Sequence, residues 1–291
     1  MHTLQACAVD NTAFRLDSGA TPDTMRNTMN TTTKQMPRDA ATDKDDKTHF
    51  GYESVSDAEK VQRVMGVFSS VASQYDLMND LMSGGMHRLW KRRMFSVAAI
   101  GAGSRVLDVA AGSGDIAIGL SKKMGPSGRV VLTDLNGPML AEGARRVIDA
   151  GLLPGRADCV QSDGARLAFA DNSFDCVTIA FGIRNFLNIE AGLAEFYRVL
   201  KPGGQFICLE FSRPMLPLLG VIYDTYSFNI IPLIGEKVTG DRDSYQYLVE
   251  SIRRFPDQGR FAKLISGADF DLVKHENMTG GIVALHRGYK V

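Results

Sequence analysis

A glycine-rich segment flanked by two aspartates is the part of the sequence best suited to chemistry. Residues Gly112–Ala117 read GSGDIA, which fits the pattern GxGxx(G/A) directly after a run of aliphatic residues. Glycines here let backbone N–H groups approach a ligand, and the start of a following helix attracts its negative part. Asp134 comes 20 residues after Gly114, where a carboxylate can accept hydrogen bonds from ribose hydroxyls. The spacing predicts a nucleotide-binding loop.

Asp108 separates two classes of nucleotide cofactor. Enzymes that use a nicotinamide dinucleotide and enzymes that use S-adenosylmethionine (SAM) share such a loop and the aspartate that follows it. Asp108 precedes the loop, where its carboxylate would repel a pyrophosphate but attract the ammonium or sulfonium group of SAM. The charge therefore favours SAM over nicotinamide. The structural alternative is an aspartate that only stabilises a turn or caps a helix.

The pair Asp163–Gly164 supplies a second candidate contact for a nucleotide. It follows the third expected strand, where a doubly wound sheet presents its ligand crevice. The carboxylate could accept from an adenine amine while the Gly164 N–H reaches a ring nitrogen. An ordinary Asp-Gly turn is the equally open alternative. The segment 201–204 (KPGG) predicts an architectural reversal from a helix into the next strand.

Strands that alternate with helices must position these residues. Helices are expected after the glycine loop, from Pro138 to Ala150, and before Leu200. Such alternation indicates right-handed βαβ units, and so an α/β fold with a doubly wound, mostly parallel sheet. The seven expected strands cover residues 105–110, 129–134, 157–162, 174–181, 204–211, 269–276 and 281–289.

The N-terminal part of the chain has a different character. Apolar residues recur at three- and four-residue spacing between residues 61 and 72, and a basic helical stretch follows at 86–99. Basic runs of this kind most often form a solvated face. Residues 1–48 contain too few large aliphatic residues to form a core and are predicted to be disordered. The expected organisation is a disordered extension (1–48) and one domain (49–291), which comprises a helical part (56–99) and an α/β core (104–291).

Composition excludes several other classes of protein. The chain has 291 residues, with 33 Lys and Arg against 33 Asp and Glu, so its formal net charge of zero opposes nucleic-acid binding through bulk charge. No CxxC pair occurs, which opposes a zinc site, and scattered cysteines without an apolar leader favour the cytoplasm. The apolar stretch Pro214–Gly235 is interrupted by Asp224, Asn229 and prolines, and we interpret it as too broken for a membrane span.

Several longer motifs are similar to those of one enzyme family. Three segments (106–115, 169–175 and 197–204) resemble class I SAM-dependent methyltransferases. More specific segments resemble the UbiE family of quinone-biosynthesis C-methyltransferases, and they cover residues 75–83, 87–91, 181–185, 198–212, 243–248 and 285–290. The resemblance extends over residues 49–291. It implies SAM-dependent methylation of a ring carbon on a polyprenylated quinol in ubiquinone or menaquinone synthesis.

The resemblance also implies which residues hold the cofactor. Ala180 stands where the family commonly has a serine, so no hydroxyl contact is expected there. The implied contacts are the methionyl part of SAM at Ser113, the ribose at Asp134, and the adenine at Asp163 and Gly164. Gly112 and Gly114 are the loop glycines whose backbone would approach the cofactor.

Methylation of a quinol ring requires an aligned ring carbon and a phenol that loses its proton. Tyr75, His87 and Arg184 are the candidate helpers. Because its pKa is too high for a base, Arg184 would stabilise the phenolate oxygen or orient a water. A structural ion pair is the open alternative for Arg184, and a solvated helix face for His87. The insertion 214–235 would form the prenyl pocket and a lid that faces the membrane, or else a helix pair in the core.

Three other functions compete with methylation of a quinol, and one feature of the sequence opposes each of them. A nicotinamide oxidoreductase is opposed by Asp108, a SAM enzyme for RNA or protein by the family signatures, and an inactive scaffold by the intact loop. We expect a cytoplasmic enzyme that needs no metal and binds no nucleic acid. Peripheral contact with the inner face of the membrane, association with other quinone-biosynthesis enzymes and a homodimer are left open.

Overall fold

The computed structural model describes residues 47–71, 75–152 and 154–291. Residues 1–48 were predicted to be disordered, and for residues 1–46 this prediction lies outside the described part of the chain. Lys47 and Thr48, however, belong to strand β1 (Lys47–Phe50), which pairs with β2 (Glu53–Ser56) in an antiparallel hairpin. The predicted boundary of the extension was therefore wrong by two residues.

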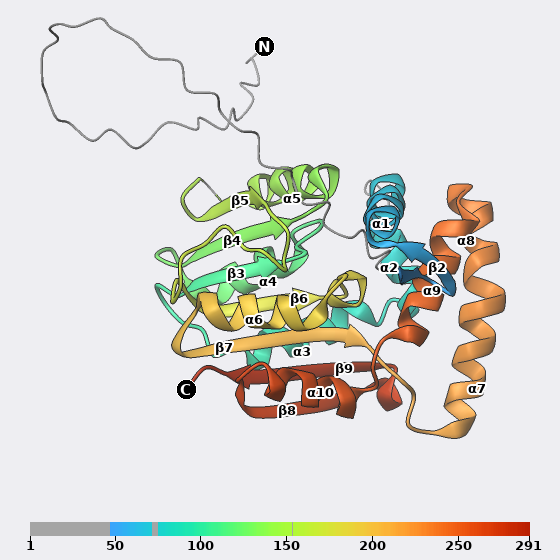
Figure 1. Ribbon diagram of the computed structural model, residues 1–291. Coiled ribbons are helices and arrows are strands. Elements are labelled where there is room, and N and C mark those ends of the chain that lie inside the picture. Colours follow the sequence, from blue (N-terminus) through green and yellow to red (C-terminus); the bar gives the residue numbers. More distant parts are fainter. Residues whose placement is uncertain (1–46, 72–74, 153) are drawn as a thin grey trace, which may run out of the picture. The chain divides into compact units, whose positions relative to one another are not determined.

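Seven strands form a single mixed sheet, which confirms the predicted fold class (Figure 1). The five strands from β3 to β7 run parallel to one another, and β9 runs antiparallel to both β7 and β8. Their spatial order is β5-β4-β3-β6-β7-β9-β8. The strands are β3 (Arg105–Val109), β4 (Arg129–Asp134), β5 (Ala157–Gln161), β6 (Phe174–Ala180), β7 (Leu200–Phe211), β8 (Asp271–Met278) and β9 (Val283–Tyr289).

The chain reverses its direction across the sheet after β5. It passes outward from β3 through β4 to β5 and then crosses back to β6 on the other side of β3. A doubly wound sheet opens a ligand crevice at such a reversal, outside the carboxyl ends of the strands. The segment Lys201–Gly204, predicted as a reversal before the strand, instead lies inside β7, beside a register shift against β6.

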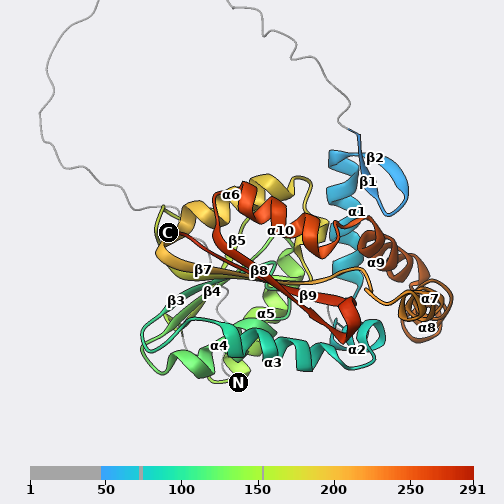
Figure 2. The ribbon, with the colours of Figure 1, turned by 90° about the horizontal axis from the view of Figure 1, so that it is seen from below.

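Helices cover both faces of the sheet, as Figure 2 shows. Val106 and Leu107 are fully buried on opposite faces, in two separate hydrophobic clusters, as expected for a strand covered on both sides. One face carries α3 (His87–Val97), α4 (Asp115–Met124) and α5 (Gly137–Asp149), and the other carries α6 (Ile189–Val199) and α10 (Gln258–Gly267).

The N-terminal helices are α1 (Asp57–Val71), α2 (Tyr75–Ser83) and α3. The interpretation of the basic stretch on α3 as a solvated face was only partly right. Arg88, Arg92 and Arg93 are exposed, but His87 and Lys91 are only 3% and 7% exposed. They share one helical face with the buried apolar residues of α3, because residues four apart lie one above the other on a helix.

The insertion after β7 folds into helices. An α-helix (α7, Pro217–Thr225), a π-helical turn (η3, Tyr226–Ile230) and a second α-helix (α8, Ile231–Thr239) follow one another without a break, and α9 (Arg242–Arg254) comes next. Pro217 lies in the first turn of α7, where an N–H group has no partner to lose, and Pro232 follows shortly after the π-helical turn.

The interruptions that the sequence analysis took to oppose a membrane span therefore do not break the helical run. Among the described residues, one helical run, Pro217–Lys237, is long and apolar enough to cross a membrane by length and composition alone. Its mean hydropathy is 1.3, and 29% of it is buried against the rest of the protein.

Candidate active site

A cavity of about 410 Å³ lies between α1 and the carboxyl ends of the parallel strands. The apolar face of α1 forms one wall with Val61, Val64, Met65 and Phe68. Ala110 and Phe181, at the ends of β3 and β6, hold left-handed backbone with φ of 49° and 58°. Such strain costs free energy in residues with a Cβ and gathers at ligand sites. The cavity thus occupies the crevice that the strand order predicts.

The glycine loop turns tightly between β3 and α4 at the edge of this cavity. Gly112 and Gly114 have φ of 51° and 77°, and Gly114 is the residue at which α4 begins. A Cβ on Gly114 would lie 3.3 Å from the carbonyl oxygen of Gly143, which is a tight contact, and the left-handed backbone at this position favours glycine. The loop places the N-terminus of α4, with its free N–H groups, beside Ser113.

Asp134 ends β4 and is tied to the loop. Its Oδ2 accepts a hydrogen bond from the Gly112 N–H at 2.9 Å, and its Oδ1 accepts from the Asn136 N–H at 2.8 Å. Burial raises the pKa of this carboxyl, and the side chain lines the large cavity. Because a carboxylate oxygen has two lone-pair directions, each oxygen can still accept from a ligand hydroxyl.

Asp163 and Gly164 line the same cavity from the loop after β5. The Asp163 Oδ1 accepts from the Ala165 N–H at 2.9 Å, so the predicted Asp-Gly turn is present together with the cavity position. A Cβ on Gly164 would lie 2.4 Å from the Phe186 ring, which gives this glycine a packing role. The Asp-Gly turn is therefore present, and the contact with adenine stays a prediction.

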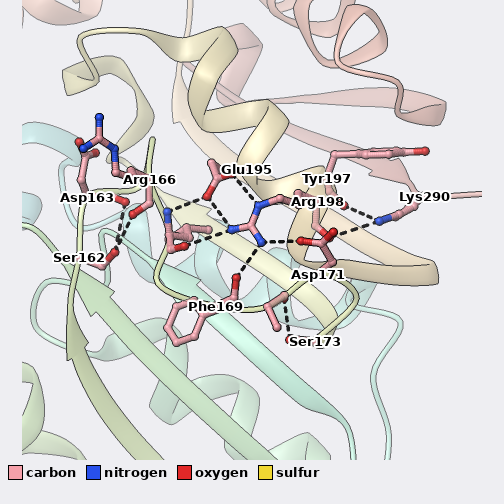
Figure 3. Close-up of polar contacts among 12 residues, drawn as sticks. Ser162, Asp163, Arg166, Phe169, Asp171, Ser173, Glu195, Tyr197, Arg198 and Lys290 are labelled. Carbon is pink, nitrogen blue, oxygen red and sulfur yellow. Dashed lines mark hydrogen bonds and ion pairs between the residues drawn. The ribbon is translucent and has the colours of Figure 1, made fainter. Parts of the chain in front are cut away.

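A network around Arg198 on α6 anchors this segment (Figure 3). The Arg198 guanidinium donates to both carboxylate oxygens of Glu195 at 2.7 Å and to the carbonyl oxygen of Phe169, and it pairs with Asp171. Glu195 in turn accepts from the Leu167 N–H at 2.7 Å. The chain between Asp163 and β6 is thereby fixed to α6, and with it the wall of the cavity.

Asp108 is a buried carboxyl group that lines a small cavity next to the large one. It is 1% exposed, its Oδ1 accepts from the Thr178 hydroxyl at 2.8 Å, and its buried Oδ2 has no hydrogen-bond partner among the described residues. Burial raises the pKa of this carboxyl to about 7. An unpaired buried carboxylate oxygen is costly, so a cationic ligand at this point would relieve that cost.

Lys91 is the residue that sequence reasoning missed. It lines a small cavity together with Asp108, Ser113 and Asp115, and this cavity shares Ala110 and Phe181 with the large one. The Lys91 Nζ donates to the Asp115 Oδ2 at 2.7 Å. The small cavity is therefore lined by one buried cation, which is paired with Asp115, and by the buried carboxyl of Asp108. The sequence did contain a signal for the burial of Lys91. It lies four residues after His87 and one after Trp90, on the apolar face of its helix.

Arg184 lies just beyond β6, in the short helical turn Ile183–Asn185, and its side chain is engaged in the interior of the protein. Its Nη1 donates to the Glu210 Oε1 at 2.9 Å and to the Phe181 carbonyl oxygen, and its Nε donates to the Ser251 hydroxyl at 3.3 Å. It is 9% exposed and does not belong to the described residues that line the large cavity. Of the two roles that the sequence left open for Arg184, the structure shows the structural ion pair.

Tyr75 and His87 are the two other catalytic candidates, and His87 is not among the described residues that line the large cavity. Tyr75 begins α2, and its side chain is outside the described part, so its role stays a prediction. The His87 Nε2 lies 2.9 Å from the Asp80 Oδ1, and burial lowers the pKa of the imidazole. Among the described residues, no three His, Cys, Asp or Glu side chains are grouped so that they could hold a metal ion.

Comparisons with known proteins agree with this geometry. A sequence model of the ubiE/COQ5 methyltransferase family matches residues 56–290. Two proteins named ubiquinone/menaquinone biosynthesis C-methyltransferase UbiE are 51% identical: one from Pseudomonas fluorescens (strain SBW25), over 85% of this chain and 96% of that protein, and one from Azotobacter vinelandii, over 84% and 96%. A crystal structure of a SAM-dependent methyltransferase from Aquifex aeolicus shares the fold, with a TM-score of 0.52 and 17% identity over 77% of this chain and 98% of that one. With the glycine loop, the strand order and these relatives in agreement, the chain belongs to the ubiE/COQ5 methyltransferase family.

Proposed function

We propose that this methyltransferase moves the methyl group of SAM to a ring carbon of a polyprenylated quinol in the synthesis of ubiquinone, menaquinone or both. The 51% identical relatives carry that activity in their names, and the match covers nearly their whole length. The observation that carries the choice of cofactor is Asp108, whose buried Oδ2 is unpaired beside Lys91 in one small cavity. The amino-acid end of SAM has the matching pair of charges, whereas the pyrophosphate of a nicotinamide cofactor is only negative.

The described residues suggest contacts along the whole length of SAM. We assign the α-ammonium group to Asp108 and the α-carboxylate to Lys91, which line a cavity of about 20 Å³ together with Ser113; this cavity has to widen to admit the amino-acid end of SAM. Asp134 would accept from the ribose hydroxyls, and Asp163 with Gly164 would hold the adenine in the large cavity. Ala180 also lines the small cavity, so the apolar methyl group that replaces the family's serine leaves this end of the site to Asp108 and Lys91.

SAM supplies a methyl group that its sulfonium already activates, so the proposal needs no metal. The residues of this chain have to hold the quinol ring in line with that methyl group and keep water away from it. Val61, Val64 and Phe68 of α1 suit the second task, because they close the large cavity with apolar side chains.

We propose that Arg184 is a positioning residue. It binds the carbonyl oxygen of Phe181, and Phe181 lines both cavities with its backbone in the left-handed region. The buried pair with Glu210 fixes the guanidinium, and the guanidinium in turn fixes the strained end of β6. Arg184 would thus shape the cofactor cavity without touching the substrate.

Calorimetric titration of the purified full chain with S-adenosylhomocysteine (SAH), the product form of SAM, and with NADH tests the cofactor assignment. We expect saturable binding of SAH and none of NADH. Transfer of a labelled methyl group to a short-chain demethylquinol, kept reduced, tests the reaction. Binding of NADH without SAH, or methylation of tRNA or protein in place of the quinol, would contradict the proposal.

A further inference from the structure

The helix α7 and the two residues before it present large apolar side chains to the solvent. The five residues Met215, Leu216, Leu218, Val221 and Ile222 are between 58% and 73% exposed. Residues 218, 221 and 222 lie on one face of the helix, at the spacing of three and four residues. In Figures 1 and 2 the run from α7 to α8 lies at the outer edge of the folded unit, with α9 between it and the sheet. We call these five residues the apolar row.

The apolar row is held in place by contacts on the opposite face of the same helix. Tyr223 is 7% exposed, and the Arg253 guanidinium at the end of α9 lies 5.6 Å from the centre of its ring. Arg253 also lies 5.8 Å from the Phe228 ring and forms an ion pair with Asp224. Because the inner face of α7 is packed and paired, the outward position of the row is a fixed property of the fold.

A basic hollow adjoins the apolar row. A cavity of about 350 Å³ is lined by four exposed cations, and none of the described residues that line it is Asp or Glu. Asp257 lies beside the hollow and pairs with Arg260 at 3.4 Å, so the four cations and this one carboxylate leave an excess of positive charge. The four cations are Arg213, Arg254, Arg260 and Lys263.

The hollow and the row are continuous. Arg213, in the wall of the hollow, comes two residues before Met215, where the row begins. Arg254, in the same wall, follows Arg253, which holds α7 from behind. An exposed apolar helix face with cations at its side is the composition of a surface that lies on an anionic membrane.

We propose that the apolar row and the basic hollow form one surface that docks on an anionic phospholipid bilayer. The row would enter the boundary between head groups and acyl chains, and the four cations would meet lipid phosphates. The inference rests on the proposed function in one respect: a polyprenylated quinol resides in a bilayer, so an enzyme that methylates it gains access by lying there.

Two other occupants fit the observations less well. A helix that spans the bilayer would have to break the ion pair between Asp224 and Arg253 and expose the buried Tyr223. A second copy of the chain, joined by a two-fold axis through this surface, would bring the four cations toward their own copies. The charge pattern therefore favours lipid phosphate as the partner.

Sedimentation of the full chain with vesicles tests the surface. We expect binding to phosphatidylcholine vesicles that contain phosphatidylglycerol, and weaker binding to phosphatidylcholine alone. Leu218→Glu with Ile222→Glu should lower binding to both about tenfold or more, because two apolar side chains leave the lipid and two like charges approach it. Ile148→Glu with Leu272→Glu is the matched control, since these apolar residues are 64% and 68% exposed elsewhere.

A second pair of variants isolates the charges. Arg260→Glu with Lys263→Glu should abolish the preference for phosphatidylglycerol and keep the weaker binding to phosphatidylcholine. Lys122→Glu with Arg129→Glu, on α4 and at the start of β4, should keep that preference. Equal loss in both pairs would mean that net charge alone drives binding and would overturn the basic hollow.

Two further measurements separate this inference from the proposed function. Methylation of a short-chain quinol in solution should be unchanged in the Leu218→Glu, Ile222→Glu variant, whereas methylation of a long-chain quinol in vesicles should fall with binding. A wild-type protein that does not sediment with either vesicle would refute the surface even if it methylates the short-chain quinol. Light scattering that shows a wild-type dimer, split by the same variant, would assign the row to a second copy and refute lipid docking.

Discussion

Replacing Asp108 by asparagine tests the assignment of the cofactor's ammonium group most directly. The substitution keeps the size of the side chain and the acceptor for the Thr178 hydroxyl, but removes the buried negative charge. The wild-type carboxyl has its pKa raised to about 7 by burial, so it is costly when empty and attractive to a cation. Asp108→Asn should therefore weaken cofactor binding and stabilise the protein without cofactor.

The loss of affinity follows from one charged contact. Hydrogen bonds to charged groups contribute about 1.5–3 kcal/mol, so the variant should bind SAH roughly ten- to 150-fold more weakly. In the wild type, only the ionised carboxylate pairs with the ammonium. The affinity for SAH should thus rise with pH up to about 7 and stay constant above it. Well below pH 7, the affinity should decrease by about tenfold for each pH unit. The variant should lose this pH dependence.

Ionised Asp108 lowers the stability of the protein without cofactor, whereas the carboxylate of an ordinary ion pair raises it. An aspartate whose pKa is raised on folding binds more protons in the folded than in the unfolded state between its two pKa values. Stability without cofactor therefore falls as pH rises from about 4 to about 7. A shift of about three units costs about 4 kcal/mol above pH 7, and an unpaired amide nitrogen returns about 1–3 kcal/mol of that. We expect Asp108→Asn to gain about 1–3 kcal/mol at pH 8.

The assay compares two ligands and two properties. SAH and 5′-methylthioadenosine, which lacks the amino-acid end, are titrated between pH 5.5 and 7.5, and Tm is measured without ligand at pH 5 and pH 8. The variant should lose affinity for SAH alone. An equal loss for both ligands would mean that the loop has collapsed. A variant that binds SAH like the wild type, or that melts lower at pH 8, would refute the reasoning about Asp108.

Four further predictions concern other parts of the chain. Lys91→Met should weaken SAH binding about tenfold or more but leave 5′-methylthioadenosine within a few-fold, as measured by titration. Asp134→Ala should weaken both ligands by roughly ten- to 150-fold and leave kcat at saturating SAM nearly unchanged. Arg184→Ala should destabilise the fold by about 3–5 kcal/mol in denaturant unfolding, because Glu210 is left buried without its partner; a stable variant with normal turnover would refute the positioning role. A chain that begins at Lys47 should keep its Tm and its methyl transfer, since the hairpin of β1 and β2 is then complete.

The local pattern of the sequence was sufficient for the sheet and for the nucleotide end of the candidate site. Aliphatic runs bounded by glycine turns set the strands, and alternation with helices leads to a doubly wound order because right-handed crossovers allow few others. Gly112, Asp134 and Asp163 all lie at strand ends, so a parallel sheet brings them to one edge whatever the rest of the chain does. Their presence around one cavity follows from short-range pattern and general topology.

The burial and the partners of the charged residues outside that edge depend on packing between segments that are distant in the sequence. Lys91 could not be separated from its exposed neighbours by composition, because burial depends on how α3 sits against α4, 24 residues further along. Arg184 could not be assigned to Glu210, 26 residues away, because an ion pair leaves no mark in the spacing of either residue. The outward face of α7 was equally hidden. Periodicity shows that a helix has an apolar face, but only the tertiary structure decides whether protein covers it, since burial is a relation between surfaces that the chain brings together after the helices have formed.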